Sequence, residues 1–519
     1  MMKKPFSRVG WILGSVVYAL FFALGAQIDS AHACTLPGTL IRFLPALAAA
    51  LLILRLILSG LDRLPALRPA ERRLPLLLCQ GVILFCWLPM FLTHYPGSFV
   101  YDTIQEMHQV ASGHYTVFHP VLHMLFMRLC MSLIGITGSF EKCLAICTLL
   151  QMLLLSLLFA LCCASLSRTA GRRAELAACA FFALYPVHMA MSVNFVKDTL
   201  FSGFFALYVT LLLEEAEVPL PLRRRCLLLL SGILACQLRN NMIYAAAVFC
   251  LFLLLIRPVR RLFPMALGVV LLSLGMQAGI RMAVHAAPGN TREMLSVPAQ
   301  QLSLAYREHP EAFSEEDTAM LDSLFPTKSY LLYTEDIADP VKDQLDDAWF
   351  SAHRGEAAAL WLRIGLRCPG SYISAFLRLM LPAYYPYASW HFTADWLEVG
   401  FDGLALTQGY GIEPLQQTHR FEDIRAWLKD NLWKNGASGI PVLRLLFNTG
   451  VLFWLCGLCL VLAACRGNLR CSGVLLLPFL LWGTYLLGPV MQGRYAYPFV
   501  CALPAMLAAV LRKTDDSGC

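Results

Sequence analysis

The segment CLLLLSGILACQLRNNMIYAAAVFCLFLLLI, residues 226–256, is apolar except at its middle, where Arg239, Asn240 and Asn241 follow one another. Its length of about 30 residues exceeds one upright membrane span and falls short of two full ones. The segment therefore predicts two short membrane helices joined by a polar turn.

The composition of the whole chain agrees with a membrane location. Hydrophobic residues make up 58% of the 519 positions, charged residues make up only 14%, and the mean hydropathy is +0.61. Soluble domains are nearer half apolar and a quarter charged, so we expect an all-α polytopic membrane protein. Most of the nineteen cysteines lie inside apolar runs, where cysteine packs as a small hydrophobe, and their spacing indicates no zinc or redox site.

Apolar runs of spanning length recur along the chain, and with the two short helices they predict about twelve spans. The other runs lie near residues 11–25, 39–59, 75–93, 143–165, 175–193, 199–213, 262–283, 441–463, 472–489 and 494–511. The segment His119–Thr137 is also apolar, but a consistent orientation of the basic loops requires that it does not cross. We expect it to form an interfacial or re-entrant helix.

Basic residues gather in short loops and predict the orientation. The clusters lie at residues 63–73, 168–173, 223–225, 257–261, 466–470 and 512–513. If all of them face the cytoplasm, both termini lie inside and residues 285–440 lie outside. That outer segment holds 21 acidic and 12 basic residues, a net charge of −9, which leaves +16 for the rest of the chain. The basic excess thus reflects membrane orientation and does not indicate nucleic-acid binding.

Four regions follow from this arrangement. They are two N-terminal spans with a basic cytoplasmic loop (1–74), a membrane core with an outer loop at 95–142 (75–284), an acidic outer segment (285–440) and three C-terminal spans (441–519). The outer segment has no obvious core of its own, and its pattern predicts amphipathic helices over 296–313, 314–325 and 343–370. At the N-terminus, a signal peptide cleaved after Ala33 and an uncleaved first span are both open, and a polytopic chain favours the span.

The outer loop YPGSFVYDTIQEMHQVASGHYTVFHP, residues 95–120, gathers titratable residues beside apolar spans. Such groups are costly at a membrane and often mark function. Asp102 is the strongest candidate, since a carboxylate here can accept a proton or hold a cation; the alternative is an acid that stabilises a helix N-terminus. His119 is a candidate ligand contact, or else the ordinary start of a helix at Pro120. The histidines lack zinc spacing, so we predict no cofactor and leave a divalent metal open.

Two charged pairs flank later spans on the outer side. Lys197 and Asp198 precede the apolar run 199–213. They suit either a phosphate-facing lysine beside a second acid, or a lysine that reaches the headgroups and an acid that caps the helix. Arg494 and Tyr495 precede the last run and suit either an anionic ligand or an interface anchor.

The polar turn of the opening segment carries the strongest signal for an anion. An arginine with two neighbouring amides, Arg239 with Asn240 and Asn241, suits a phosphate or pyrophosphate. Two outward arginines at membrane level, Arg239 and Arg494, together favour an anionic ligand. The weaker candidates are Gln300, Gln301 and His391.

These features, in this order, resemble the GT-C superfamily of integral-membrane glycosyltransferases. In that family an acidic residue follows a span and an interfacial helix with a proline start comes next, as in Tyr101-Asp102 and FHPVLHMLFMRLCMSLIG. The segment FFALYPVHMAMSVNFVKDTLF resembles the family's next span and acidic turn, and GILACQLRNNMIYAAAVF resembles its paired short helices. The resemblance covers roughly residues 75–260 and the RY pair near the C-terminus. The two spans before the outer loop are extra, and a compact C-terminal soluble domain is lacking.

The resemblance implies an inverting glycosyltransferase that moves a sugar from a polyprenyl-phosphate donor to an envelope acceptor. The reaction would take place outside a bacterial cytoplasmic membrane, with the bilayer, donor and acceptor as partners. Asp102 would be the base, and Arg239, with Lys197 or Arg494, would bind the donor phosphate. Weaker substrate contacts would be His119, Asp198, Asn240, Asn241 and Tyr495. Two alternatives stay open: a transporter or flippase for an anionic lipid-linked sugar, and a non-catalytic envelope scaffold.

Overall fold

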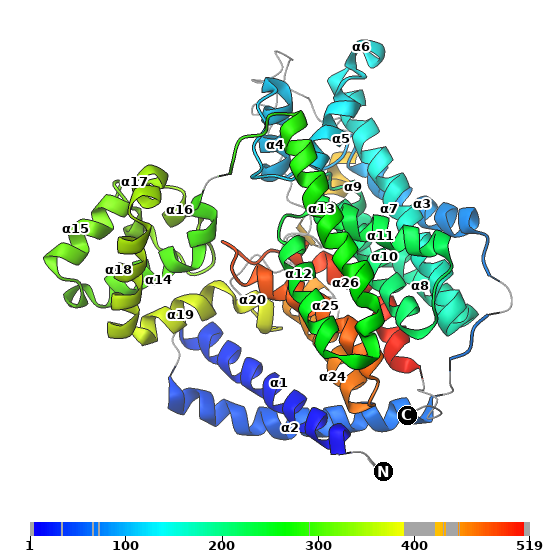
Figure 1. Cartoon of the computed structure of the whole chain (residues 1–519), viewed down its shortest axis with the longest axis horizontal. Helices are drawn as coiled ribbons and strands as arrows, with labels where there is room; N and C mark the ends of the chain where they lie inside the picture. The colour runs from blue at the N-terminus through cyan, green and yellow to red at the C-terminus, as the bar shows by residue number, and fades with distance from the viewer. Residues whose placement is uncertain are drawn as a thin grey trace.

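The computed structural model describes residues 5–32, 35–64, 67–70, 73–289, 291–388, 421–428, 430–431, 445 and 447–512. Within these residues the regular structure is helical, with three isolated β-bridges and no strand (Figure 1). The predicted all-α class is confirmed for this part of the chain.

Each predicted apolar run falls wholly or partly on a helix. The helices are α1 (Pro5–Ala31), α2 (Leu36–Arg63), α3 (Leu76–Thr93), α7 (Phe140–Ala170), α8 (Arg172–Leu184), α9 (Pro186–Val193), α10 (Lys197–Glu217), α11 (Leu222–Leu238), α12 (Met242–Leu255), α13 (Phe263–Ala283), α24 (Thr449–Cys465), α25 (Leu469–Tyr485) and α26 (Gly493–Leu511). Among the described residues, seven helices are long and apolar enough to cross a membrane, and the bent pair α8–α9 would make an eighth. Helices α12, α24 and α25 are apolar but shorter. The chain is therefore a polytopic membrane protein by the length and composition of its helices.

The run 175–193, predicted as a span, forms two helices with a bend between them. Helices α8 and α9 meet at an angle of 56°. Pro186 is the first residue of α9, and Tyr185 before it is extended. Proline has no amide hydrogen to continue the helix of α8, and it disfavours helical geometry in the residue before it, which accounts for the bend.

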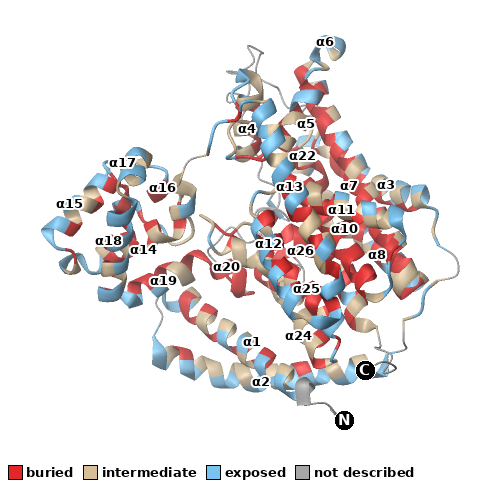
Figure 2. Ribbon diagram, in the orientation of Figure 1, coloured by how far each residue is buried: buried red, intermediate tan, exposed pale blue. Residues whose placement is uncertain are grey.

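Helix α10 is the centre of the membrane bundle. Every residue from Lys197 to Ala216 is buried, mainly by α7, α11 and α26 (Figure 2). Its 21 residues rise about 30 Å, the thickness of a bilayer core. At its far end Glu214 pairs with Arg224, and Glu215 lies 2.9 Å from Arg225 of a predicted cytoplasmic loop. Lys197 therefore lies at the opposite end of the bundle from that basic loop.

The outer loop 95–142 forms α4 (Tyr101–Ser112), α5 (Val121–Met131) and α6 (Ile134–Thr137). Helix α5 has 11 residues and rises about 17 Å, too little to cross a bilayer. Together, α5 and α6 form an apolar stretch, Val121–Thr137, in the same length class as α12, α24 and α25, so the expectation that His119–Thr137 does not cross stays a prediction.

The outer segment has a core that the sequence pattern did not predict. Its helices include α14 (Ser296–Glu308), α15 (Glu315–Leu324), α16 (Asp339–Lys342), α17 (Asp347–Ala352), α18 (Arg354–Arg367) and α19 (Pro369–Leu379). Leu302, Leu321 and Leu360 come from separate helices and are buried together. Each helix contributes one apolar face, so the core arises only when the helices pack. Candidate His391 lies outside the described residues.

Candidate active site

A short backbone contact sets the position of Asp102. The amide of Ser98 donates to the carbonyl of Val193, and the amide of Phe195 donates to the carbonyl of Ser98, both at 2.8 Å. The hydroxyl of Thr103 also donates to the carbonyl of Phe195 at 2.7 Å. These bonds tie the start of α4 to the turn before α10. Asp102, in the first turn of α4, is thereby placed next to Lys197, the first residue of α10.

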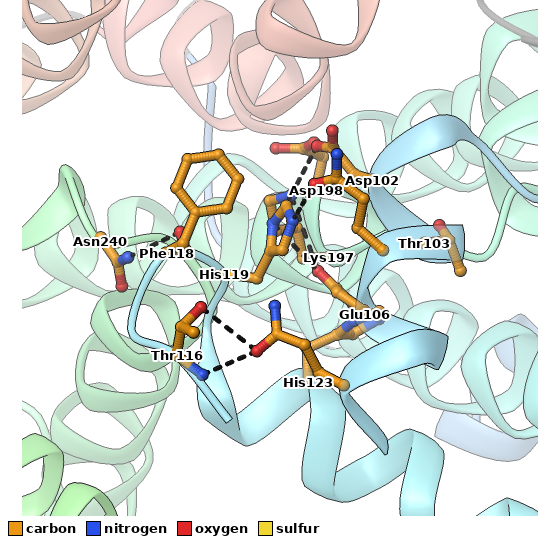
Figure 3. Close-up of polar contacts among 12 residues, drawn as sticks. Asp102, Thr103, Glu106, Thr116, Phe118, His119, His123, Lys197, Asp198 and Asn240 are labelled. Atoms are coloured by element: carbon orange, nitrogen blue, oxygen red, sulfur yellow. Dashed lines mark hydrogen bonds and ion pairs between the residues drawn. The ribbon is translucent and has the colours of Figure 1, made fainter. Parts of the chain in front are cut away.

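Asp102 lies between two cations, Lys197 and Arg494, and Figure 3 shows the contact with Lys197. Its Oδ2 accepts a hydrogen bond from Lys197 Nζ at 2.6 Å, and Arg494 Nη1 lies 3.1 Å from the same oxygen. The side chain of Asp102 is 23% exposed, whereas those of Lys197 and Arg494 are 11% and 8% exposed. Burial raises the pKa of the Asp102 carboxyl, but the charges of Arg494 and Lys197 outweigh it and hold the pKa well below its usual value. In this state Asp102 is an anion with a weak tendency to take a proton.

Arg239 is held by a different carboxylate. It pairs with Asp198, which is 1% exposed. Its guanidinium lies 4.8 Å from the ring centre of Tyr485 and 4.5 Å from that of Tyr495, so it is also held by cation–π contacts. Arg494 Nε is 3.9 Å from Asp198, which brings the two arginines to one site.

The two amides after Arg239 bind protein groups. Asn240 Nδ2 donates to the carbonyl of Val117 at 3.0 Å, and Asn241 Nδ2 donates to the hydroxyl of Thr484 at 2.7 Å. Both amides thus hold the α11–α12 turn against its neighbours. The weaker candidates Gln300 and Gln301 likewise donate to backbone carbonyls in the outer segment.

Gln105 and Glu106 lie next to His119 and Lys197, with His123 behind Glu106, and none of these three was a predicted site residue. Glu106 is 1% exposed and accepts a hydrogen bond from His123 Nδ1. His119 Nδ1 is 3.2 Å from Lys197 Nζ, and its Nε2 is 2.9 Å from Gln105 Oε1. Burial and the Lys197 ammonium lower the pKa of His119 to about 4, so its ring is neutral at pH 7. The spacing of Asp102 and Glu106, four residues apart on one helix face, was the available signal.

A cavity of about 650 Å³ lies between the membrane bundle and the outer segment. From the membrane side it is lined by Asp102, His119, Lys197, Arg239, Asn240, Asn241, Arg494 and Tyr495. The outer segment adds Arg292, Glu293, Asp339, Lys342 and Asp343. Asp198 is the one predicted site residue near the membrane that does not line the cavity; it lies behind Arg239 and pairs with it. The volume suits a ligand the size of a sugar phosphate.

Carboxylates also surround a lysine in the outer wall. Lys342 Nζ is within 3.1 Å of Glu293, Asp339 and Asp343, and its side chain is 4% exposed. The carbonyl of Pro489 accepts from the amide of Ala338 at 2.8 Å, which attaches this wall to the loop before α26. Within the described part of the chain, no three His, Cys, Asp or Glu side chains are grouped as metal ligands.

Residues 110–518 match a family described as Family of unknown function (DUF6020). The chain belongs to this family. No curated protein and no solved structure matches the chain significantly. The DUF6020 match includes His119, Lys197, Arg239 and Arg494, and it begins eight residues after Asp102.

Proposed function

We propose that the protein is a membrane glycosyltransferase that uses a polyprenyl-phosphate-linked sugar as donor. The observation that carries the proposal is the position of Asp102 at a polar cavity, between Lys197 and Arg494, at one end of an apolar helical bundle. A site at the level of the bilayer surface suits a donor whose tail stays in the lipid. The order of elements that resembles the GT-C superfamily supports the same class.

In the proposed reaction an acceptor hydroxyl attacks the anomeric carbon of the sugar. The bond from that carbon to the phosphate oxygen breaks, and polyprenyl phosphate leaves with the electron pair. Lys197 and Arg494 stabilise the negative charge that develops on the leaving phosphate. Asp102 takes the proton of the acceptor hydroxyl. Attack opposite the leaving group inverts the configuration.

The low pKa of Asp102 constrains this role. A carboxylate held between two cations is a poor base until those cations find another anion. The donor phosphate provides that anion, because it competes with Asp102 for Lys197 and Arg494. Donor binding thus increases the basicity of Asp102, and Arg239, held by Asp198, supplies a third cation at the cavity wall.

The proposal includes the membrane arrangement. Twelve spans, with α11, α12, α24 and α25 among them, place both termini in the cytoplasm and the cavity on the outer side of a bacterial cytoplasmic membrane. The basic loops support this orientation. An envelope glycan, lipid or protein is the proposed acceptor.

The test is the release of free polyprenyl phosphate from a panel of polyprenyl-phosphate-linked hexoses, measured by mass spectrometry with the full chain in native membranes. Asp102→Asn is expected to reduce release by roughly 10²–10⁴-fold, the range of general-base catalysis. Glu316→Gln, an exposed acid at the start of α15, is the matched control and should leave release unchanged. Undiminished release by Asp102→Asn would exclude this residue as the base. Intact donor moved across a proteoliposome without cleavage would favour the transporter.

A further inference from the structure

Glu106 is a buried carboxylate that the proposed reaction does not use. It lies one helical turn after Asp102 on α4, and its side chain is 1% exposed. Its Oε2 accepts the hydrogen bond from His123, while its Oε1 is 3.7 Å from Lys197 Nζ and 3.8 Å from His119 Nδ1. Oε1 has no hydrogen-bond partner among the described residues. One oxygen is therefore held from behind, and the other faces the cluster around Lys197 (Figure 3).

His119 cannot balance the charge of Lys197. Gln105 Oε1 is an acceptor, so His119 Nε2 carries the hydrogen and donates it. The other nitrogen, Nδ1, then carries a lone pair, which accepts a hydrogen bond from Lys197 Nζ at 3.2 Å. A neutral imidazole in this tautomer orients the ammonium but carries no negative charge.

Asp102 and Glu106 are thus the two carboxylates within 4 Å of Lys197 Nζ among the described residues. When Asp102 takes a proton it becomes neutral, and Lys197, whose side chain is 11% exposed, keeps the donor phosphate and Glu106 as counter-charges; once polyprenyl phosphate departs, Glu106 is the carboxylate that remains. An unpaired ammonium in such a site is costly and would move toward water. Glu106 is close enough to prevent this.

His123 accounts for the orientation of Glu106. Its ring is fully buried, and its centre is 5.0 Å from that of Phe195. Packing against that aromatic ring directs Nδ1 toward Glu106 Oε2. Phe195 belongs to the turn that also binds Thr103, so the same turn places both carboxylates of α4.

We propose that Glu106, oriented by His123, is a positioning residue that holds the Lys197 ammonium at the donor phosphate after Asp102 has accepted the proton. This assignment rests on the proposed function for its role in the reaction. The geometric part, that Glu106 holds Lys197 when Asp102 is neutral, can be tested without any substrate.

The first experiment uses Asp102→Asn as a mimic of protonated Asp102. Amines of the purified full chain are acylated with acetic anhydride, and the rate at Lys197 is followed by mass spectrometry, with the exposed Lys328 as internal reference. Lys197 is expected to stay protected in Asp102→Asn. In the double variant Asp102→Asn/Glu106→Gln it should react about tenfold faster, in line with coupling energies between contacting charged residues. The rate at Lys328 should be the same in both.

Equal acylation rates of Lys197 in Asp102→Asn and in the double variant would overturn the proposal, because Glu106 would then not hold the Lys197 ammonium. If the double variant does not fold, Asp102→Asn alone decides: retained protection supports the role of Glu106, and lost protection overturns it. Glu141→Gln, in the first turn of α7, is the control for removal of an outer carboxylate.

The second experiment measures binding of farnesyl phosphate, a short polyprenyl phosphate. In the Asp102→Asn background, Glu106→Gln should weaken binding about tenfold when Lys197 is present and have no effect when Lys197→Met is added. Equal losses in both backgrounds would show that Glu106 acts on the structure and not through Lys197. A wild-type chain that does not bind farnesyl phosphate would count against the proposed donor, while the acylation rates would still decide the role of Glu106.

Discussion

The ion pair between Arg239 and Asp198 should be worth far more than a surface pair. Asp198 is 1% exposed, and removal of its guanidinium partner by Arg239→Met would leave a buried carboxylate with Arg494 Nε at 3.9 Å as its nearest charge. Breaking a buried pair in this way costs about 3–5 kcal/mol. We expect Arg239→Met to fall in the lower part of that range because Arg494 partly compensates.

The double variant Arg239→Met/Asp198→Leu should recover most of the lost stability, since apolar residues in place of a whole buried pair are often neutral or stabilising. Lys328→Met is the matched control, because Lys328 and Asp322 form a 3.3 Å pair that is 58% and 35% exposed. Such a surface pair contributes about 0–1 kcal/mol.

The assay is equilibrium unfolding of the full chain in detergent micelles, combined with farnesyl phosphate binding. If Arg239→Met lowers the free energy of unfolding by no more than Lys328→Met does, the burial argument is refuted. A double variant with restored stability but lost binding would assign Arg239 to the donor phosphate. Restored stability with retained binding would assign it to the scaffold.

Three further predictions follow from single contacts. Arg494→Lys keeps the charge but loses the planar guanidinium that contacts both Asp102 and Gln492, so the affinity for farnesyl phosphate should fall about tenfold. Unchanged affinity would show that only the charge of Arg494 contributes to phosphate binding. His119 stays neutral in the folded chain down to pH about 4, whereas the unfolded chain takes the proton near 6.5, so stability should fall as the pH drops through that window, by up to about 1.4 kcal/mol per pH unit. His119→Gln should flatten this slope in unfolding curves taken from pH 6.5 to 4; an unaltered slope would mean that other groups produce it. Ser314→Ala removes the capping box with Asp317 at the start of α15 and should cost about 1 kcal/mol in unfolding, with no change in phosphate-lipid binding.

Much of the site could be anticipated because each residue interrupts an apolar run. Four of these residues are far apart along the chain, with successive separations of about 100, 40 and 250 residues, yet all four line one cavity: Asp102, Lys197, Arg239 and Arg494. The pattern placed each of them at the same membrane level, which is the reason the prediction of a shared site was possible.

Glu106 shows where that reasoning stopped. Its spacing of four residues from Asp102 places both carboxylates on one face of α4, but the spacing alone does not show whether that face meets Lys197 or solvent. His108 and His114, from the same stretch, are exposed. Glu106 differs from these residues because it lies on the side of α4 that faces His123 of α5 and Lys197.

By itself the sequence determined the membrane class, the positions of the apolar helices and the polar breaks between them. These depend on local composition and period, which act over one helix at a time. The tertiary structure alone decided which carboxylate pairs with which cation and how the core of the outer segment forms. Such features depend on contacts between helices far apart in the chain, and a charge in an apolar core is tolerated only where one of those contacts supplies its partner.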